Sequence, residues 1–475
     1  MDPITVAIIA IVLLLVLLAI ETPVAYALGI SGAVGLVLLH SFSYATSVLG
    51  SAPFVQTFSF TLTVIPTFIL IGIFAVHGNV ANYVYTISNH VFRKLPGGLG
   101  AATVMACAGF AAVTGSSVAT TATMARLAVD QMRRYGYPIS FAAGLVACAG
   151  TLGIMIPPSI ILVLYSVITG ESAGRMLAAG ILPGLLTATA YITYALIRGR
   201  KIVDPEMAER ALATAAATSG KYGGTAGGKG RGTGMPLGAP SGGANVAGVP
   251  QVRSRDLPWR GLVYIGIIFT IVLGGIYSGL FTATESGAIG ALAAFAIMCI
   301  ELRRTSWHGI WAMVKSALLE AASTTGMVFA IVVGSSIFSA FLIQSGTPQA
   351  LTRAVQELPI ESWAVVVLFL LILVPLGMGL ESISILIITM PLMYPVVISL
   401  GYDGIWFGIL AVKLIEIGLV TPPVGISTFV AAASAKVPVE KVFQGVWPFL
   451  AVDVVVVAIL FLFPEMVLWL PNLAQ

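Results

Sequence analysis

The residues best suited to chemistry are small and hydroxyl-bearing, and they recur in two groups inside apolar sequence. The first group is Thr114-Gly115-Ser116-Ser117, and the second lies at residues 377–382 and includes the carboxylate of Glu381. Hydroxyl and backbone carbonyl oxygens are hard ligands, which suit Na⁺ rather than a soft metal. A carboxylate at membrane depth is expensive and is therefore a functional candidate. Close helix packing also explains small residues in such places, but the helix breaks described next favour ligation.

Each group has a partner downstream, in the form of a helix that two adjacent prolines must break. Pro157-Pro158 follows Gly153, and Pro422-Pro423 follows Gly418, each inside an apolar run. A proline lacks an N–H and clashes with the carbonyl four residues back, so the freed carbonyls need protein, water or an ion as partner. The half-helices after the prolines direct a partial positive charge at the membrane midplane, where an anionic substrate can be held.

These features predict two cation sites and one anion site. The predicted Na⁺ ligands of the first half are Thr114, Gly115, Ser116, Ser117, Thr151, Gly153 and Pro157. Those of the second half are Gly377, Gly379, Glu381, Ser382, Gly418, Val420, Thr421 and Pro422. The predicted substrate-binding residues are Ser159, Val424 and Gly425.

Other ionisable residues support less specific predictions. Lys413 and Glu416 are spaced i, i+3 on the helix that leads into Pro422, so they either neutralise each other or shape the site. Asp453 and Glu285 are expected near interfaces or in structural roles. The four histidines are scattered without metal-ligand spacing, and no Ser/His/Asp arrangement occurs. We therefore expect neither an enzyme nor an organic cofactor.

The composition predicts a polytopic membrane protein. Of 475 residues, 58% are hydrophobic and 9% are charged, whereas about 25% charged is usual for soluble domains. Residues 4–20 have the length of a signal peptide, with Ala25-Tyr26-Ala27 as a possible cleavage site. The positive n-region is missing and Asp2 stands there instead, which favours a first membrane helix.

Apolar spans near the roughly 20 residues needed to cross a bilayer recur along the chain. They lie at residues 3–20, 24–39, 59–78, 139–168, 181–198, 259–279, 283–301, 322–343, 404–433 and 447–464. Two further apolar pairs, 99–113 with 118–130 and 362–376 with 383–398, are separated only by short turns. Each arm is short for a full crossing, so both pairs are predicted to be re-entrant hairpins.

Charge places the two hairpins on opposite sides, because Lys and Arg mark cytoplasmic loops. The first hairpin is flanked by the basic residues Arg93, Lys94, Arg126, Arg133 and Arg134. The second is flanked by the acidic residues Glu357, Glu361 and Asp403. Both ends of the first hairpin are therefore predicted to be cytoplasmic, and both ends of the second to be outside.

The two halves match at a single shift. Pro157-Pro158 and Pro422-Pro423 are separated by 265 positions (157 to 422), as are Gly136-Tyr137 and Gly401-Tyr402 (136 to 401). Because the hairpins enter from opposite sides, the repeat is predicted to be inverted, an arrangement that marks secondary transporters with sites near the midplane.

The repeat predicts three segments. Residues 1–203 form the first repeat, with scaffold helices at 1–96, a transport part at 97–180 and a helix at 181–198. Residues 259–475 form the second repeat, with scaffold helices at 259–360, a transport part at 361–440 and a helix at 447–464. Residues 204–258, rich in Gly, Ala and Thr, are predicted to be a flexible cytoplasmic linker. This linker contains a Gly-rich string, but the ending of a phosphate loop is missing, so no nucleotide site is expected.

Four blocks of the sequence together resemble the large membrane subunit (M or DctM type) of tripartite ATP-independent periplasmic (TRAP) transporters. They are residues 114–119, 156–160, 279–285 and 416–425, the last being Glu-Ile-Gly-Leu-Val-Thr-Pro-Pro-Val-Gly. The resemblance covers nearly the whole chain except the linker. The family often has Asp at the position of Glu381, and the long linker is unusual for it.

The resemblance implies an elevator-type ion-transporter fold in a bacterial inner membrane. It implies Na⁺-coupled uptake of an organic acid anion, such as a dicarboxylate or a sialic-acid-like substrate. A periplasmic substrate-binding protein would deliver this anion, and a small four-helix membrane subunit (Q or DctQ type) would be a second partner. The small subunit is expected to be a separate chain, because no extra helices precede Ile4.

Two other functions stay open at the level of sequence. A self-sufficient Na⁺/anion symporter would need no binding protein. A channel would show a charged ring or a wide polar pore, and an intramembrane enzyme would show a catalytic set; neither pattern is present. Nothing in the sequence suggests a nucleic-acid partner.

Overall fold

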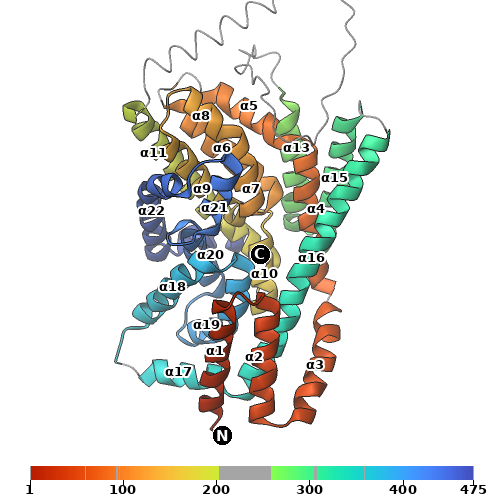
Figure 1. Ribbon diagram of the computed structural model, residues 1–475, viewed down its shortest axis with the longest axis vertical. Helices are drawn as coiled ribbons and strands as arrows, with labels where there is room; N and C mark the ends of the chain where they lie inside the picture. Colours follow the sequence, from red (N-terminus) through yellow and green to blue (C-terminus); the bar gives the residue numbers. More distant parts are fainter. Residues whose placement is uncertain are drawn as a thin grey trace, which may run out of the picture.

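The computed structural model describes residues 2–58, 60–92, 95, 97–202, 258–303, 307–357 and 359–473. Every regular element within these ranges is a helix (Figure 1). The helices of the first half are α1 (Pro3–Ala19), α2 (Val24–Leu39), α3 (Phe42–Thr57), η1 (Phe60–Thr63), α4 (Val64–His77), α5 (Val80–Phe92), α6 (Gly98–Thr114), α7 (Ser117–Met124), the π-helical η2 (Ala125–Val129), α8 (Asp130–Arg134), α9 (Ile139–Met155), α10 (Ile160–Thr169) and α11 (Ala173–Ile202).

The second half follows the same pattern of long and broken helices. Its elements are α13 (Arg260–Phe269), the π-helical η4 (Thr270–Gly274), α14 (Gly275–Tyr277), α15 (Ala283–Leu302), α16 (Trp307–Gln344), α17 (Thr347–Glu357), α18 (Ser362–Gly379), α19 (Ser382–Ser399), α20 (Gly404–Val420), α21 (Ile426–Ala435), α22 (Val439–Leu462) and α23 (Glu465–Leu473).

The helices confirm the predicted all-α membrane class. Seven of those in the described ranges are long and apolar enough to cross a membrane, or up to nine if each of two bent pairs counts as one span. One bent pair is α4 with α5, at 65°, and the other is α9 with α10, at 44°. The second bend lies at Pro157-Pro158, where the proline pair predicts a break.

The structure differs from the predicted spans in several places. It forms α3 over 42–57, where no span is predicted because Ser, Thr and Pro53 dilute the apolar pattern. The predicted span 322–343 is only the second part of the 38-residue helix α16. Two of the residues used to orient the first hairpin, Arg93 and Lys94, lie outside the described residues, as does all of the predicted linker except Pro258.

The helices pack in two groups. In one, α16 runs along α2 and α4, and α4 also packs against α15. In the other, α9 packs against α6, α7 and α22, while α20 packs against α18 and α22. Fewer pairs join the groups, among them α4 with α6 and α16 with α19. The predicted division into scaffold and transport parts stays a prediction: α4, α15 and α16 lie in the predicted scaffold, but α5, which is also predicted to belong to it, packs against α6 of the predicted transport part.

The two helical hairpins lie in opposite halves of the molecule. In Figure 1, α6, α7 and α8 occupy the upper half, whereas α17 lies at the bottom and leads into α18 and α19 below the centre. The shift of 265 positions also holds for the broken helices, because α9 begins and ends at 139 and 155 and α20 at 404 and 420. These observations support an inverted repeat, which remains a prediction.

Polar side chains fix the starts of several helices. Asp403 caps α20 by accepting bonds from the backbone N–H groups of Ile405 and Trp406, at 2.8 and 3.0 Å. Glu285 closes a capping box at the start of α15, where its carboxylate accepts a bond from the backbone N–H of Thr282 at 2.8 Å. Satisfying these end groups matters in hydrocarbon, where few other donors or acceptors are present. Glu285 thus has the predicted structural role.

Candidate functional site

The tip of the first hairpin lies directly against the first helix break. Gly115 joins α6 to α7 with a φ of 59°, in the left-handed region that favours glycine. A Cβ atom added at Gly115 would lie 2.5 Å from the carbonyl oxygen of Pro158, and one at Gly153 would lie 2.7 Å from that of Ser116. These separations leave no room for a side chain. Glycine therefore lets the backbone of the hairpin tip and the backbone of the broken helix come into direct contact.

Several hydroxyl groups of this half already form hydrogen bonds within the protein. The Thr151 hydroxyl donates to the Cys148 carbonyl at 2.7 Å, and the Thr114 and Thr120 hydroxyls share a bond of 2.8 Å. Ser159, which is fully buried, donates to the Ile154 carbonyl across the break and accepts from the N–H of Leu162. It therefore caps the start of α10, so its hydroxyl stabilises the break, although sequence reasoning assigned it to the substrate.

The second hairpin meets the second break in the same way. A Cβ atom at Gly418 would lie 2.6 Å from the Cα atom of Gly377. The N–H of Gly425 donates to the Met378 carbonyl at 3.0 Å, which ties the broken helix to the hairpin tip. The Thr421 hydroxyl donates to the Ile417 carbonyl at 2.5 Å. Both proline pairs, Pro157-Pro158 and Pro422-Pro423, have a cis peptide bond.

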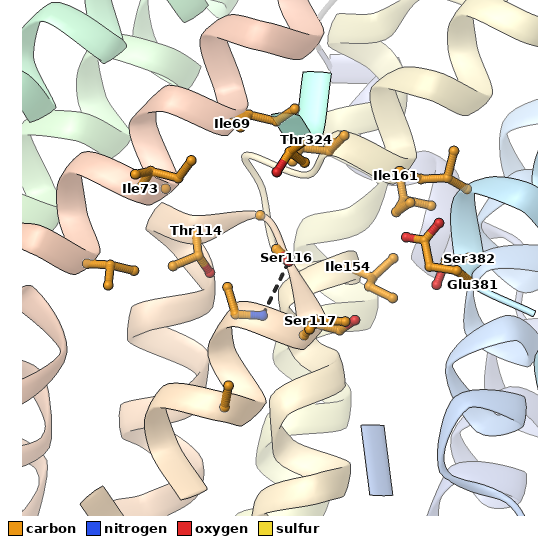
Figure 2. Close-up of a pocket in the computed structure, with 18 of the residues that line it drawn as sticks. Ile69, Ile73, Thr114, Ser116, Ser117, Ile154, Ile161, Thr324, Glu381 and Ser382 are labelled. Carbon is orange, nitrogen blue, oxygen red and sulfur yellow. Dashed lines mark hydrogen bonds between the residues drawn. The ribbon is translucent and has the colours of Figure 1, made fainter. Parts of the chain in front are cut away.

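A cavity of about 480 Å³ lies where the two hairpin tips come together (Figure 2). Thr114, Ser116 and Ser117 line one side, and Glu381 and Ser382 line the other. Ser117 and Ser382 are both buried, and the dashed bond in Figure 2 joins the Ser116 hydroxyl to the N–H of Ala119 at the start of α7. The tip of the first hairpin and the carboxylate of the second hairpin therefore line the same cavity.

The predicted ligands fall into two sets around this cavity. Gly115 lines it together with the hydroxyl and carboxyl residues just named. The other predicted residues are not among those that line it, namely Thr151, Gly153, Pro157, Ser159, Gly377, Gly379, Gly418, Val420, Thr421, Pro422, Val424 and Gly425. Gly153, Gly377, Gly418 and Gly425 instead form contacts between a hairpin tip and a broken helix, whereas Gly379 and Val424 are exposed.

The cavity also contains residues that the sequence analysis missed. A further wall of the cavity is formed by two helices. Helix α4 contributes Gly72 and Ile73, and helix α16 contributes Glu320 and Thr324. Glu320 and Thr324 are four residues apart, which places two polar side chains on one face of a helix, and that spacing is a signal that could have been used. Arg126 lines the cavity as well, from the π-helical segment η2.

A buried ionic cluster lies beside the second break. The ammonium of Lys413 is 2.9 Å from Glu416 Oε2 and 2.9 Å from Asp453 Oδ1. The Tyr191 hydroxyl donates to Asp453 Oδ2 at 2.6 Å. The predicted pairing of Lys413 with Glu416 is thus confirmed, and Asp453 on α22 is a third member that sequence spacing alone did not connect to them.

The oxygen atoms gathered here suit a hard monovalent cation. Backbone carbonyls, Ser and Thr hydroxyls and one carboxylate converge on the tips and breaks. Within the described ranges, no three His, Cys, Asp or Glu residues are grouped as a divalent or soft metal would need. Helix α10 begins at the cavity, which Ile160 and Ile161 line, so its N-terminal N–H groups lie near a space where an anion could bind.

The sequence model described as "Tripartite ATP-independent periplasmic transporter, DctM component" matches residues 11–466. The chain belongs to this family. A relative from Pseudomonas aeruginosa, the C4-dicarboxylate TRAP transporter large permease protein DctM, is 33% identical over 454 residues, covering 94% of this chain and 93% of the relative. The sialic acid TRAP transporter large permease protein SiaM of Vibrio cholerae is 26% identical and covers 87% of each chain.

Among solved structures, the YdaH transporter of Alcanivorax borkumensis has a similar fold. Its TM-score is 0.58, with 14% sequence identity and 88% of both chains covered. Together with the apolar helices, the family makes this chain a TRAP transporter large permease, a multi-pass protein of the bacterial inner membrane.

Proposed function

We propose that this permease couples Na⁺ entry to the uptake of an organic acid anion. The observation that carries the proposal is the meeting of two hairpin tips from opposite halves at one cavity, each tip pressed against a broken helix. Oxygen atoms on each tip and each break would hold one Na⁺ as a co-substrate. Binding of Na⁺ would order the tips and so complete the anion site between them.

The substrate is proposed to be a small carboxylate. The Pseudomonas relative is named for C4-dicarboxylates and the Vibrio relative for sialic acid. A cavity of about 480 Å³ has room for molecules of this size. The N-terminal N–H groups of α10 would contact the carboxylate, because such groups can donate hydrogen bonds to an anion.

In the proposed transport step, the group of helices that contains the two hairpins moves against the group that contains α2, α4 and α16. A second cavity of about 660 Å³ lies along the same seam, between α16 and α17 on one side and α10 and α19 on the other. Because spaces flank the line where the groups meet, few side chains would have to leave a packed core when one group slides past the other. This arrangement supports an elevator mechanism.

The proposed partners are a periplasmic substrate-binding protein and a small membrane subunit of the Q type. The family description is that of a tripartite system, which supports both. The binding protein would supply the anion on the outer side, and much of the selectivity would then belong to that protein.

Uptake of radiolabelled succinate into proteoliposomes tests the proposal, with a panel of other carboxylates if succinate is not bound. Vesicles would contain this chain with its small subunit, and the matching binding protein would be added outside. We expect uptake with an inward Na⁺ gradient and none with an equal K⁺ gradient. Equal uptake with both would contradict Na⁺ coupling. Uptake at full rate without the binding protein would contradict the tripartite arrangement.

A further inference from the structure

The buried cluster of Lys413, Glu416 and Asp453 contains more negative than positive charge. The side chains of these residues are 0%, 1% and 2% exposed. Among the described residues, Lys413 is the cation paired with both carboxylates. One ammonium against two carboxylates leaves a formal charge of −1 inside the protein. Such a charge is costly in a membrane unless a cation compensates it.

The hydrogen bonds within the cluster leave part of this negative charge unsatisfied. Glu416 Oε2 binds Lys413, but the other oxygen, Oε1, is buried and has no hydrogen-bond partner in the described part of the chain. Among the residues that the structure describes, Asp453 accepts the Tyr191 hydroxyl with Oδ2, while its Oδ1 lies 2.9 Å from the Lys413 ammonium as an ion pair without a hydrogen bond. Within these residues, each carboxylate therefore has one oxygen that no hydrogen bond satisfies, and Glu416 and Asp453 share the surplus negative charge.

Glu416 lies close to the proposed second cation site. It precedes Val420, the last residue of α20, by four positions, which is about 6 Å along a helix axis. Gly418, between them, is the residue that packs on Gly377 of the second hairpin. The negative charge and the freed carbonyls are thus carried by one helix, all of whose residues are buried.

The first half has no equivalent charge. A shift of 265 positions matches Lys413 to Cys148, Glu416 to Thr151 and Asp453 to Ala188, all of them neutral at their places in the first half. Tyr191 comes from that half and supports the cluster only through its hydroxyl. The charge is therefore specific to the second half of the repeat.

We propose that the Lys413–Glu416–Asp453 cluster is the electrostatic counter-charge for the cation at the second hairpin. Glu416 and Asp453 do not touch the ion. Instead, their surplus negative charge lowers the free energy of a cation bound at the end of α20. Lys413 neutralises half of the carboxylate charge and holds α20 to α22. This inference rests on the proposed Na⁺ coupling and names a determinant of cation affinity for the second site.

The amide variants Glu416→Gln and Asp453→Asn test the proposal in the reconstituted complex. Each removes one negative charge, keeps the side-chain shape and leaves Lys413 with one carboxylate partner. We expect the Na⁺ concentration for half-maximal uptake to rise about tenfold or more in both, because removing one negative charge from the cluster weakens the electrostatic attraction for a cation at the end of α20. The maximal rate should stay close to that of the unmodified protein.

Tyr191→Phe is the matched control, because it removes a hydrogen bond of the cluster without changing its charge. We expect no shift in the Na⁺ dependence of this variant. If Tyr191→Phe shifted it as far as Asp453→Asn, the cluster would act by packing and the proposal would be wrong. Unchanged Na⁺ dependence in both amide variants, with Na⁺-driven uptake intact, would overturn this inference alone. Uptake by the unmodified protein that does not depend on Na⁺ would instead overturn the proposed function, and the inference with it.

Discussion

At the scale of residues, the site depends on backbone atoms that approach more closely than side chains allow. Gly153 and Gly418 occupy matching positions in the two broken helices, and each packs against a hairpin tip. Ser117 and Thr421 carry hydroxyl groups and lie within three residues of these contacts in sequence. Substitutions at these four positions therefore separate the effect of spacing from the effect of ligation.

Gly418→Ala is expected to reduce Na⁺-driven uptake at least tenfold. The added Cβ atom would lie 2.6 Å from Gly377 Cα and 2.6 Å from the carbonyl oxygen of Val374, and neither backbone atom can move cheaply. Gly266→Ala is the control, since a Cβ there meets no atom within 4 Å and alanine favours a helix. Uptake assays of both variants at equal membrane abundance check the prediction. Equal activity of Gly418→Ala and Gly266→Ala would contradict the close-packed tip.

Ser117→Ala and Thr421→Ala are expected to raise the Na⁺ concentration for half-maximal uptake several-fold while leaving expression unchanged. Loss of one oxygen ligand removes about 1 kcal/mol of interaction, and 1.4 kcal/mol corresponds to tenfold in affinity. Ser51→Ala, an exposed serine on α3, serves as the control. Unchanged Na⁺ activation in both test variants would remove these residues from the ligand set.

At the scale of elements, the helix that leads into the first hairpin is held to the neighbouring helices by one carboxylate. Glu301 on α15 accepts bonds from the Tyr83 hydroxyl of α5 at 2.5 Å and from the Tyr264 hydroxyl of α13 at 2.7 Å. Arg260 adds an ion pair at 3.5 Å, but its side chain is 63% exposed. The two tyrosine bonds, rather than the ion pair, should therefore fix α5.

Glu301→Gln is expected to lower the stability of the protein by about 1–2 kcal/mol, because an amide accepts through one oxygen only and leaves one tyrosine hydroxyl without an acceptor. Arg260→Gln should change stability by less than about 1 kcal/mol. Thermal unfolding of both variants in detergent compares them. A larger loss of stability in Arg260→Gln than in Glu301→Gln would show that the ion pair dominates.

Much of the element arrangement could be predicted from the sequence, because prolines and glycines have strong local consequences. The proline pairs place both breaks at the right residues, and the shift of 265 matches the bounds of α9 and α20. The spacing of Glu320 and Thr324 could have indicated a polar face on α16, but it could not have placed that face at the cavity, since nothing local connects α16 with the hairpins. Asp453 was also missed as a partner of Lys413, because the two residues are 40 positions apart (413 to 453) and meet only through helix packing.

At the scale of the whole molecule, two similar halves contribute unequally to the candidate site. Both halves present a hairpin tip to a broken helix, but only the second carries Glu381 on its tip and the ionic cluster behind its break. The two proposed cation sites should be coupled, because their hairpin tips line one cavity and an ion that orders one tip shapes the wall next to the other. The coupling predicts cooperative dependence on Na⁺.

The dependence of the initial uptake rate on Na⁺ concentration tests this central claim most directly. In proteoliposomes with the complete tripartite system and saturating substrate, we expect a sigmoidal curve with a Hill coefficient between about 1.5 and 2. Two sites that both must fill before transport require a coefficient above one. A hyperbolic curve with a coefficient of about 1, or a rate that does not depend on Na⁺, would contradict a cation site in each half.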